Sequence, residues 1–393
     1  MNYLHDKRII TVLSHALRSE VEIMAEKPIW QRPFTWLFTI CCLIFIILII
    51  FTLVNDKFYR IPLAQVTDVK EVHTKHITDD HHNHDTKHTQ RLTLKMLNGK
   101  YEGRTTTLHN TYAESQADSE KFSTHNKVLL HVGKNLKDMY IIEKKRDTLV
   151  VTLTGIFILT VLWAGKRIGI HSILSLVVNS TAVLAAIAIH NAYPSINLFG
   201  LMSVAVILGT IVTLLLVIGW NLRTGITIVS TLLGTFICVG LMQLIISLTG
   251  GNGLKFETMG FLTLPPTEVF LASVMIGSLG AVMDVAITIS SGMAEILRRK
   301  PDISLTRWAL AGRHIGQDIM GTMTNILLFS YLSGALPMFL IYLTNENTIT
   351  YSVSMNWSLE ISRAITGGIG IVLTIPITIL LMQFWWRMRG VKR

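Results

Sequence analysis

Long apolar runs alternate with short polar segments along most of the chain. Each run is long enough to cross about 30 Å of hydrocarbon at a rise of about 1.5 Å per helical residue, although the second is short. The runs occupy residues 34–54, 148–164, 168–190, 198–220, 225–248, 269–297, 316–344 and 361–386. The pattern predicts an α-helical integral membrane protein with about eight transmembrane helices.

The polar stretch between the first two runs has a different period. Apolar and polar residues alternate at 64–72, 91–97, 127–132 and 138–143, with turn residues such as Asn98-Gly99 between them. Period-two alternation bounded by turns is typical of β-strands. We therefore expect a small all-β domain of about five strands, a barrel or a sandwich. The predicted division is an N-terminal segment (1–33), helix one (34–54), a β domain (55–147), a seven-helix domain (148–386) and a tail (387–393).

Basic residues between the apolar runs predict the orientation. With eight helices, all of these clusters fall on one side of the membrane, the side that the positive-inside rule identifies as cytoplasmic. They are Lys27 and Arg32, Lys166 and Arg167, Arg223, Arg298 to Lys300, and Arg387, Arg389, Lys392 and Arg393. Both termini are then cytoplasmic, and residues 55–147 are extracytoplasmic.

Composition agrees with a membrane protein. Hydrophobic residues make up 50% of the chain and charged residues only 15%. The net charge of +10 comes from the short clusters between apolar runs, so it indicates topology and not nucleic-acid binding. Cys41, Cys42 and Cys238 all lie in apolar runs, which predicts no disulfide in the polar domain. Residues 5–24 fit either an amphipathic helix on the membrane surface or a solvated tail.

The run at 269–297 carries the candidate chemistry. At helical spacing one face presents Gly277, Ala281, Asp284, Thr288, Ser291 and Glu295. Gly277 and Ala281, with Gly280 beside them, permit close helix packing. Asp284 lies near the middle of the membrane, where a carboxylate must be protonated, paired or hydrated. We therefore expect Asp284, Thr288 and Ser291 to form a proton or ion site. The alternative is that Asp284 only hydrogen-bonds a neighbouring helix, and Glu295 is expected to pair with Arg298 and Arg299.

A second polar stripe follows in the next run. His314, Asp318, Gly321, Thr322 and Asn325 recur at three or four residues. Asn325 is deep enough to face Asp284, and Gly321 is a packing position. Asp318 either lines the cytoplasmic entrance or pairs with a nearby arginine. The isolated polar residues Asn179, His190 and Gln243 are expected to hydrogen-bond between helices.

Histidines are concentrated at residues 73–88, where His81, His82 and His84 are weak candidates for metal binding. Their spacing matches no defined metal site, so a mobile polar hairpin loop is the favoured interpretation. The chain contains no GxxxxGK[ST], GxGxxG, HExxH or GxSxG motif. We therefore expect no cofactor, no resident metal and no enzymatic activity.

Several segments resemble the YibE/F family of bacterial multi-pass membrane proteins. They are GSLGAVMDVAITISSGMAE at 277–295, HIGQDIMGTMTN at 314–325, LNGKYEG at 97–103 and LHNTY at 108–112. The resemblance extends from about Leu63 onward and implies a bacterial cell membrane, but it does not imply an activity. Gln317, where the family pattern would have Arg, and the histidine-rich segment depart from it. A weaker likeness to the SecD/SecF and proton-driven exporter families is analogy only.

Two functions follow from these observations. The first is a transporter or export-related permease, coupled to ions or protons through Asp284. The second is a membrane-anchored receptor or scaffold that binds an extracellular partner through the β domain. The expected partners are the lipid bilayer and a second membrane subunit or a homo-oligomer, with no nucleic acid.

Overall fold

The computed structural model describes residues 33–117, 119–133, 138–259 and 264–390 of the chain. The helix or tail expected at residues 5–24 lies outside these described residues. The described chain forms two compact units, one of residues 33–79 and 84–170 and one of residues 80–83 and 171–390. The first contains the sheet, and the second contains most of the helices.

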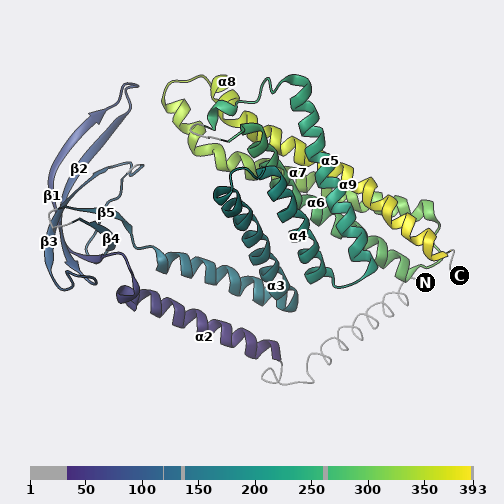
Figure 1. The fold of residues 1–393 in the computed structure, drawn as a ribbon, viewed down its shortest axis with the longest axis horizontal. Helices are drawn as coiled ribbons and strands as arrows, with labels where there is room; N and C mark the ends of the chain where they lie inside the picture. Colours follow the sequence, from purple (N-terminus) through teal and green to yellow (C-terminus); the bar gives the residue numbers. More distant parts are fainter. Residues whose placement is uncertain (1–32, 118, 134–137, 260–263, 391–393) are drawn as a thin grey trace, which may run out of the picture. The chain divides into compact units, whose positions relative to one another are not determined.

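One antiparallel sheet of five strands forms the polar part of the first unit. The strands are β1 (Leu63–Thr78), β2 (His84–Met96), β3 (Thr105–Ala113), β4 (Lys127–Val132) and β5 (Met139–Lys144). Their order is β3-β2-β1-β4-β5 (Figure 1). The expected number of strands is confirmed, although β3 fell outside the predicted segments. Among the described residues β3 and β5 do not pair, so the domain is a single open sheet instead of a barrel or a sandwich.

Alternation places every second residue of the central strands in one core. Ala64 and Val66 of β1, and Leu92 and Leu94 of β2, are fully buried there. Phe122, from the loop before β4, covers the same cluster. Period-two patterning therefore fixes both the register and the buried face of the sheet.

The histidine-rich segment is an ordered hairpin, not the expected loop. β1 and β2 stay paired as far as Thr78 and His84. Three histidine–threonine pairs lie across the ladder: His84 with Thr78 at 2.9 Å, His76 with Thr86 at 3.1 Å, and His88 with Thr74 at 3.3 Å. His81 and His82 lie in the turn between the strands. The described residues contain no group of three or more His, Cys, Asp or Glu that could hold a metal ion.

Two apolar helices flank the sheet in sequence, α2 (Pro33–Val54) and α3 (Asp147–Ala192). They touch closely, because a Cβ on Gly155 of α3 would lie 1.9 Å from the ring of Phe45 in α2. Helix α3 contains two of the predicted spans, separated by a sharp break at Lys166 (φ 47°, ψ −122°). At this turn a Cβ on Gly169 would lie 2.4 Å from the carbonyl oxygen of Val161.

The second unit packs the remaining long helices around two central ones. They are α4 (Leu198–Ile218), α5 (Leu222–Thr249), α6 (Pro266–Arg299), α7 (Leu305–Thr344) and α9 (Ser358–Gly390), with the one-turn α8 (Ile349–Ser352) before α9. The most apolar stretches of α6 and α9 are 56% buried, against 11% for that of α7. By length and composition, seven helices in the described chain could cross a membrane. The predicted eight become seven because α3 is counted once.

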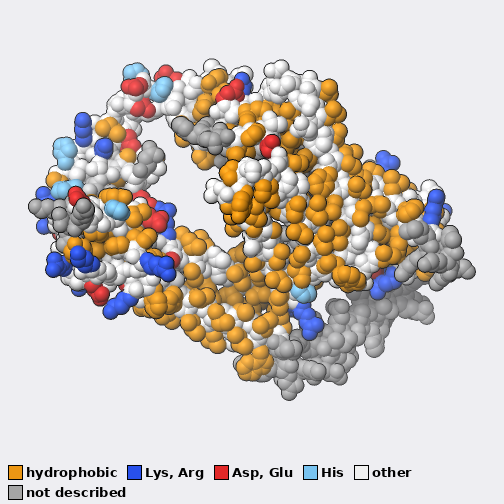
Figure 2. Space-filling model, in the orientation of Figure 1, with side chains coloured by type: hydrophobic (Ala, Val, Ile, Leu, Met, Phe, Trp, Pro, Cys, Tyr) orange, Lys and Arg blue, Asp and Glu red, His pale blue; other side chains and the backbone are white. Residues whose placement is uncertain are grey.

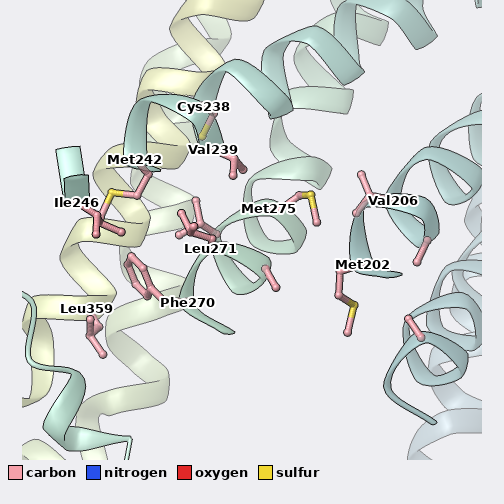
Figure 3. Packing of buried hydrophobic residues seen from close by; sticks show 14 residues of the cluster. Met202, Val206, Cys238, Val239, Met242, Ile246, Phe270, Leu271, Met275 and Leu359 are labelled. Atoms are coloured by element: carbon pink, nitrogen blue, oxygen red, sulfur yellow. The ribbon is translucent and has the colours of Figure 1, made fainter. Parts of the chain in front are cut away.

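Three glycines of α9 allow side chains of α7 and α5 to approach it closely. Gly367 faces Leu327 of α7, Gly368 faces Thr324 of the same helix, and Gly370 faces Cys238 of α5, each 3.0 Å from an added Cβ. Figure 3 shows the adjoining hydrophobic cluster, in which Cys238, Val239, Met242 and Ile246 of α5 lie near residues of α6 such as Leu271. These contacts make α9 a closely packed helix.

Apolar side chains also cover the outside of the helices. In Figure 2 hydrophobic side chains cover the visible helical surface, whereas charged and histidine side chains gather over the sheet. Along α2 alone, Leu43, Ile47 and Leu53 are all more than half exposed. A helix that is apolar all round needs an apolar surrounding.

We predict that Gly234→Ala destabilises the helical unit. An added Cβ would lie 2.1 Å from Thr374 Oγ1 of α9 and 3.0 Å from Val282 of α6. Forcing α5 away from both should cost about 1–3 kcal/mol, measured as a lower unfolding temperature of the detergent-solubilised protein. Gly240→Ala on the same helix is the control, because nothing lies within 4 Å of its added Cβ. Equal stability of the two variants would contradict this packing.

Candidate functional site

Asp284 lies in a groove between α3, α4 and α6. The groove has a volume of about 580 Å³. Its lining is mostly apolar, and Asp284 is the one ionisable residue in it. The other lining residues are Asn179, Ser180, Val183, Leu184, Ala205, Val206, Ile276, Leu279, Gly280 and Met283. The described residues thus place a single carboxylate on the wall of an apolar groove.

No side chain in the described part of the chain is paired with the Asp284 carboxylate. It makes no hydrogen bond or ion pair with any described residue, and its backbone oxygen accepts a hydrogen bond from Thr288 Oγ1 at 2.8 Å. Asn179, across the groove, donates a hydrogen bond to Thr213 Oγ1 of α4 at 2.9 Å. Asn179 therefore links α3 to α4, as expected for an isolated polar residue, and it also lines the groove. The carboxylate remains available to a proton, a cation or water.

The other expected site residues are distributed over two surfaces. Thr288 is exposed and Ser291 half-buried on the face of α6 that carries Asp284. Asn325 and Asp318 are exposed on α7, and among the described residues no hydrogen bond joins either of them to Asp284. Asp318 forms no ion pair with a described arginine. Asn325 is not among the residues that line the groove, and α7 turns Tyr331 against Gly277 of α6.

The remaining predictions for these helices have mixed outcomes. The expected ion pairs of Glu295 are confirmed, with Arg298 Nη2 at 2.9 Å and Arg299 Nε at 2.7 Å. Gly277 is a close-packing position, since an added Cβ would lie 1.7 Å from the Tyr331 hydroxyl. Gly280 borders the groove, and Gly321 has nothing within 4 Å of an added Cβ. Gly321 is thus open on the exposed side of α7.

A buried ion pair in α9 was not anticipated from the sequence. Arg363 pairs with Glu360 one turn earlier, and its Nε donates a hydrogen bond to Ser273 Oγ of α6 at 3.1 Å. Its side chain is only 15% exposed. The signal was an arginine within an apolar run, where a charge is costly unless it is paired.

Aromatic rings complete the surroundings of Arg363. The guanidinium carbon lies 5.6 Å from the ring centre of Phe270 in α6 and 5.2 Å from that of Tyr331 in α7. These distances are suitable for cation–π attraction, which is strongest where water is excluded. One arginine therefore joins α6, α7 and α9 at the ends where α6 and α9 begin.

Buried hydroxyl groups line the contact between α5, α6 and α9. Thr227 of α5 and Ser290 of α6 share a hydrogen bond of 2.9 Å, and Cys238 Sγ donates to the Thr366 carbonyl oxygen at 3.1 Å. Thr231 and Thr235 are fully buried, and their hydroxyl groups have no partner among the described residues. The contact between α5, α6 and α9 therefore contains a series of uncharged polar groups.

In the first unit, a network of charges ties the sheet to α2 and α3. Lys127 Nζ of β4 lies 2.6 Å from Asp56, just after α2. Lys145, whose side chain is 4% exposed, lies 3.3 Å from Asp147 at the start of α3 and 3.8 Å from Asp56. Asn55 and Tyr59 also donate hydrogen bonds to Asp147, at 2.9 and 3.0 Å. Burial first, and then the hydrogen bond to Asp147, raise the pKa of Tyr59 to about 12.

The fold and these sites define a protein of long apolar helices with one antiparallel sheet between the first two of them. The chain belongs to the YibE/F family, since the model described as YibE/F-like protein matches residues 153–388 and the model of the YibE/F family N-terminal domain matches residues 57–144. The family expected from the sequence motifs is confirmed. Comparisons with curated proteins and with solved structures give no match.

We predict that removing one member of the Glu360–Arg363 pair costs far more than removing one member of an exposed pair. Arg363→Met leaves Glu360 half-buried and unpaired, which should destabilise the fold by about 3–5 kcal/mol. The measurement is the free energy of unfolding in detergent.

The matched control is Arg298→Met, which removes one of the two exposed ion pairs of Glu295 and should cost less than about 1 kcal/mol. In Glu360→Gln/Arg363→Met neither charge remains, so the double variant should lose less than the sum of the two single variants. An additive result would show that the two side chains act separately.

Proposed function

We propose that this protein is a membrane transporter or export-related permease. In this proposal a proton or cation binds in the groove of α3, α4 and α6 during transport. The observation that supports this is the free Asp284 carboxylate, the one ionisable residue on the groove wall. A carboxylate in an apolar surrounding can gain and lose a proton as water or a cation reaches it. Such a group is suited to coupling transport to an ion gradient.

The arrangement of the helices supports a transport movement in which α3 and α4 move and α9 stays fixed. α6 and α9 are joined by glycine contacts and by the Arg363 cluster. α3 and α4 are joined to each other by the hydrogen bond from Asn179 to Thr213. Packed interfaces have discrete arrangements, so we propose that α3 and α4 shift against α6 while α9 stays in place. We propose no catalytic role, because the chain contains none of the common nucleotide or hydrolase motifs.

The proposed topology keeps both termini on the cytoplasmic side of a bacterial cell membrane and residues 55–147 outside. A helix of 46 residues is far longer than one crossing needs, and α3 breaks at Lys166 beside Arg167. We propose that α3 crosses twice with this turn on the cytoplasmic side, which gives eight crossings. The basic clusters then share one side, in agreement with the positive-inside rule.

The polar stripe of α7 suggests a partner. Asp318, Gly321, Thr322 and Asn325 are all exposed on this helix. Polar side chains are costly in contact with lipid tails, so within a bilayer this face needs protein against it. The amide of Asn325 both donates and accepts hydrogen bonds and can pair with its own copy, and Gly321 allows close approach. We propose that a second copy of the chain packs there.

Asp284→Asn should abolish proton-coupled flux without unfolding the protein. An amide is close in shape to a carboxylic acid, so the groove stays intact while the titratable group is lost. The measurement is acidification of proteoliposomes that contain a pH-sensitive dye, with unfolding temperature as the check on folding. Asp302→Asn is the control, because it removes one exposed carboxylate between α6 and α7 that does not line the groove.

Normal flux and full cellular function of Asp284→Asn would refute the proposal. The receptor or scaffold is the second candidate, and it is favoured by the Asp56, Lys127, Lys145 and Asp147 network that ties the sheet to two helices. Deleting residues 63–145 separates the two candidates. Complete loss of function in that deletion, together with normal Asp284→Asn, would favour the receptor.

Asn325→Leu should lower the fraction of dimer in native-like membranes several-fold, because each copy loses an interhelical hydrogen bond worth about 1–2 kcal/mol. Chemical crosslinking or single-molecule photobleaching measures this fraction. Gln243→Leu is the control, since it removes an exposed amide from α5. A monomeric wild-type protein, or equal dimer fractions in both variants, would contradict the α7 interface.

A further inference from the structure

A second groove lies in the first unit, where the sheet meets α2 and α3. It has a volume of about 690 Å³. The segment after α2, strands β4 and β5 and the first turn of α3 form its walls. The lining residues are Asn55, Phe58, Tyr59, Arg60, Ile61, Leu129, Glu143, Lys144, Arg146, Asp147 and Val150. The groove is therefore at the ends of two apolar helices, where they join polar structure.

Only some of the charges in this groove are already used. Asp147 accepts hydrogen bonds from Asn55 and Tyr59 and pairs with Lys145, and Arg146 pairs with Glu120. Arg60, Lys144 and Glu143 form no ion pair with any residue in the described part of the chain. Two cations and one carboxylate thus line a single groove without protein partners.

Apolar surface lies beside these charges. Phe58 is 77% exposed, and Ile61 and Val150 are also exposed. Large exposed apolar side chains next to a groove mark a surface that binds something. An occupant must therefore combine an anionic group, a cationic group and an apolar part.

We propose that this groove binds a phospholipid with a phosphoethanolamine headgroup. Arg60 and Lys144 hold the phosphate, and Glu143 accepts hydrogen bonds from the ammonium group. Phe58, Ile61 and Val150 contact the glycerol and the beginning of the acyl chains. The proposal rests on the membrane placement proposed above, which puts the ends of α2 and α3 at the outer interface.

The three free charges distinguish this lipid from its common alternatives. A phosphocholine headgroup has a phosphate, but its trimethylammonium group has no N–H to donate to Glu143. A phosphoglycerol headgroup offers hydroxyl groups but no cation, so it leaves the charge of Glu143 without a counterion. Inorganic phosphate could meet the two cations but leaves the apolar wall uncovered.

The test is lipid binding to the full-length protein in detergent, followed by native mass spectrometry. Dioleoyl phosphatidylethanolamine, phosphatidylcholine and phosphatidylglycerol are titrated separately, with inorganic phosphate as a competitor. We expect phosphatidylethanolamine to bind most tightly to the unaltered chain. Arg60→Gln and Lys144→Gln should each weaken that binding about tenfold, because each removes a hydrogen-bonding charge. Glu143→Gln should remove the preference over phosphatidylglycerol.

Lys87→Gln is the control, because it removes an exposed cation of β2 that does not line the groove. Equal affinity of the unaltered chain for all three lipids would overturn the proposal without any substitution. Displacement of the lipid by inorganic phosphate, or equal weakening by Lys87→Gln, would overturn it too. Failure here leaves Asp284-dependent flux untouched, since Asp284 lies in the other unit. If Asp284→Asn shows normal flux while the lipid selectivity is as expected, only the transport proposal is refuted.

Discussion

The close approach of helices to α9 is the contact on which the helical unit depends. Gly367 and Gly368 leave room for α7, Gly370 leaves room for α5, and Gly234 of α5 does the same towards Thr374. In an apolar solvent, burial of apolar surface cannot drive helices together, so close van der Waals contact must do so. With α9 fixed in this way, α6 is held beside it, and Asp284 lies on the side of α6 that lines the groove with α3 and α4.

Most buried charged side chains described above are paired with other polar groups. Arg363 lies inside the bundle, but Glu360, Ser273 and two aromatic rings surround it, so its burial is compensated. The network around Lys145 does the same for the sheet and the ends of α2 and α3. Asp284 differs from both, because its carboxylate has no partner among the described residues. An unpaired carboxylate is a cost to stability that a functional site tolerates.

The sequence predicted elements better than contacts. Apolar runs located the ends of most long helices to within a few residues, but α7 begins at Leu305, before the predicted start at residue 316. The first turns of α7 are too polar to be recognised as part of an apolar run. Alternation located four of the five strands. The missed strand, β3, lies at the edge of the sheet and is rich in threonine and other polar residues. Its sequence therefore shows no clear alternation of apolar and polar positions. The break at Lys166 was expected as a loop between helices, whereas the structure turns the chain there within a single residue of unusual backbone conformation.

Contacts between helices depend on rotation about the helix axis, which periodicity alone leaves open. Asp284 and Asn325 each stand on a recognisable polar stripe, and two polar stripes on neighbouring helices suggest a shared interface. The structure instead directs the stripe of α7 outward, because Leu327, Thr324 and Gly316 are needed against α9. The small residues that permit α7 to reach α9 therefore decide where its polar residues lie. Asp284 lines the groove of α3, α4 and α6, so the proposed function assigns the meeting of a proton or cation with the protein to this groove.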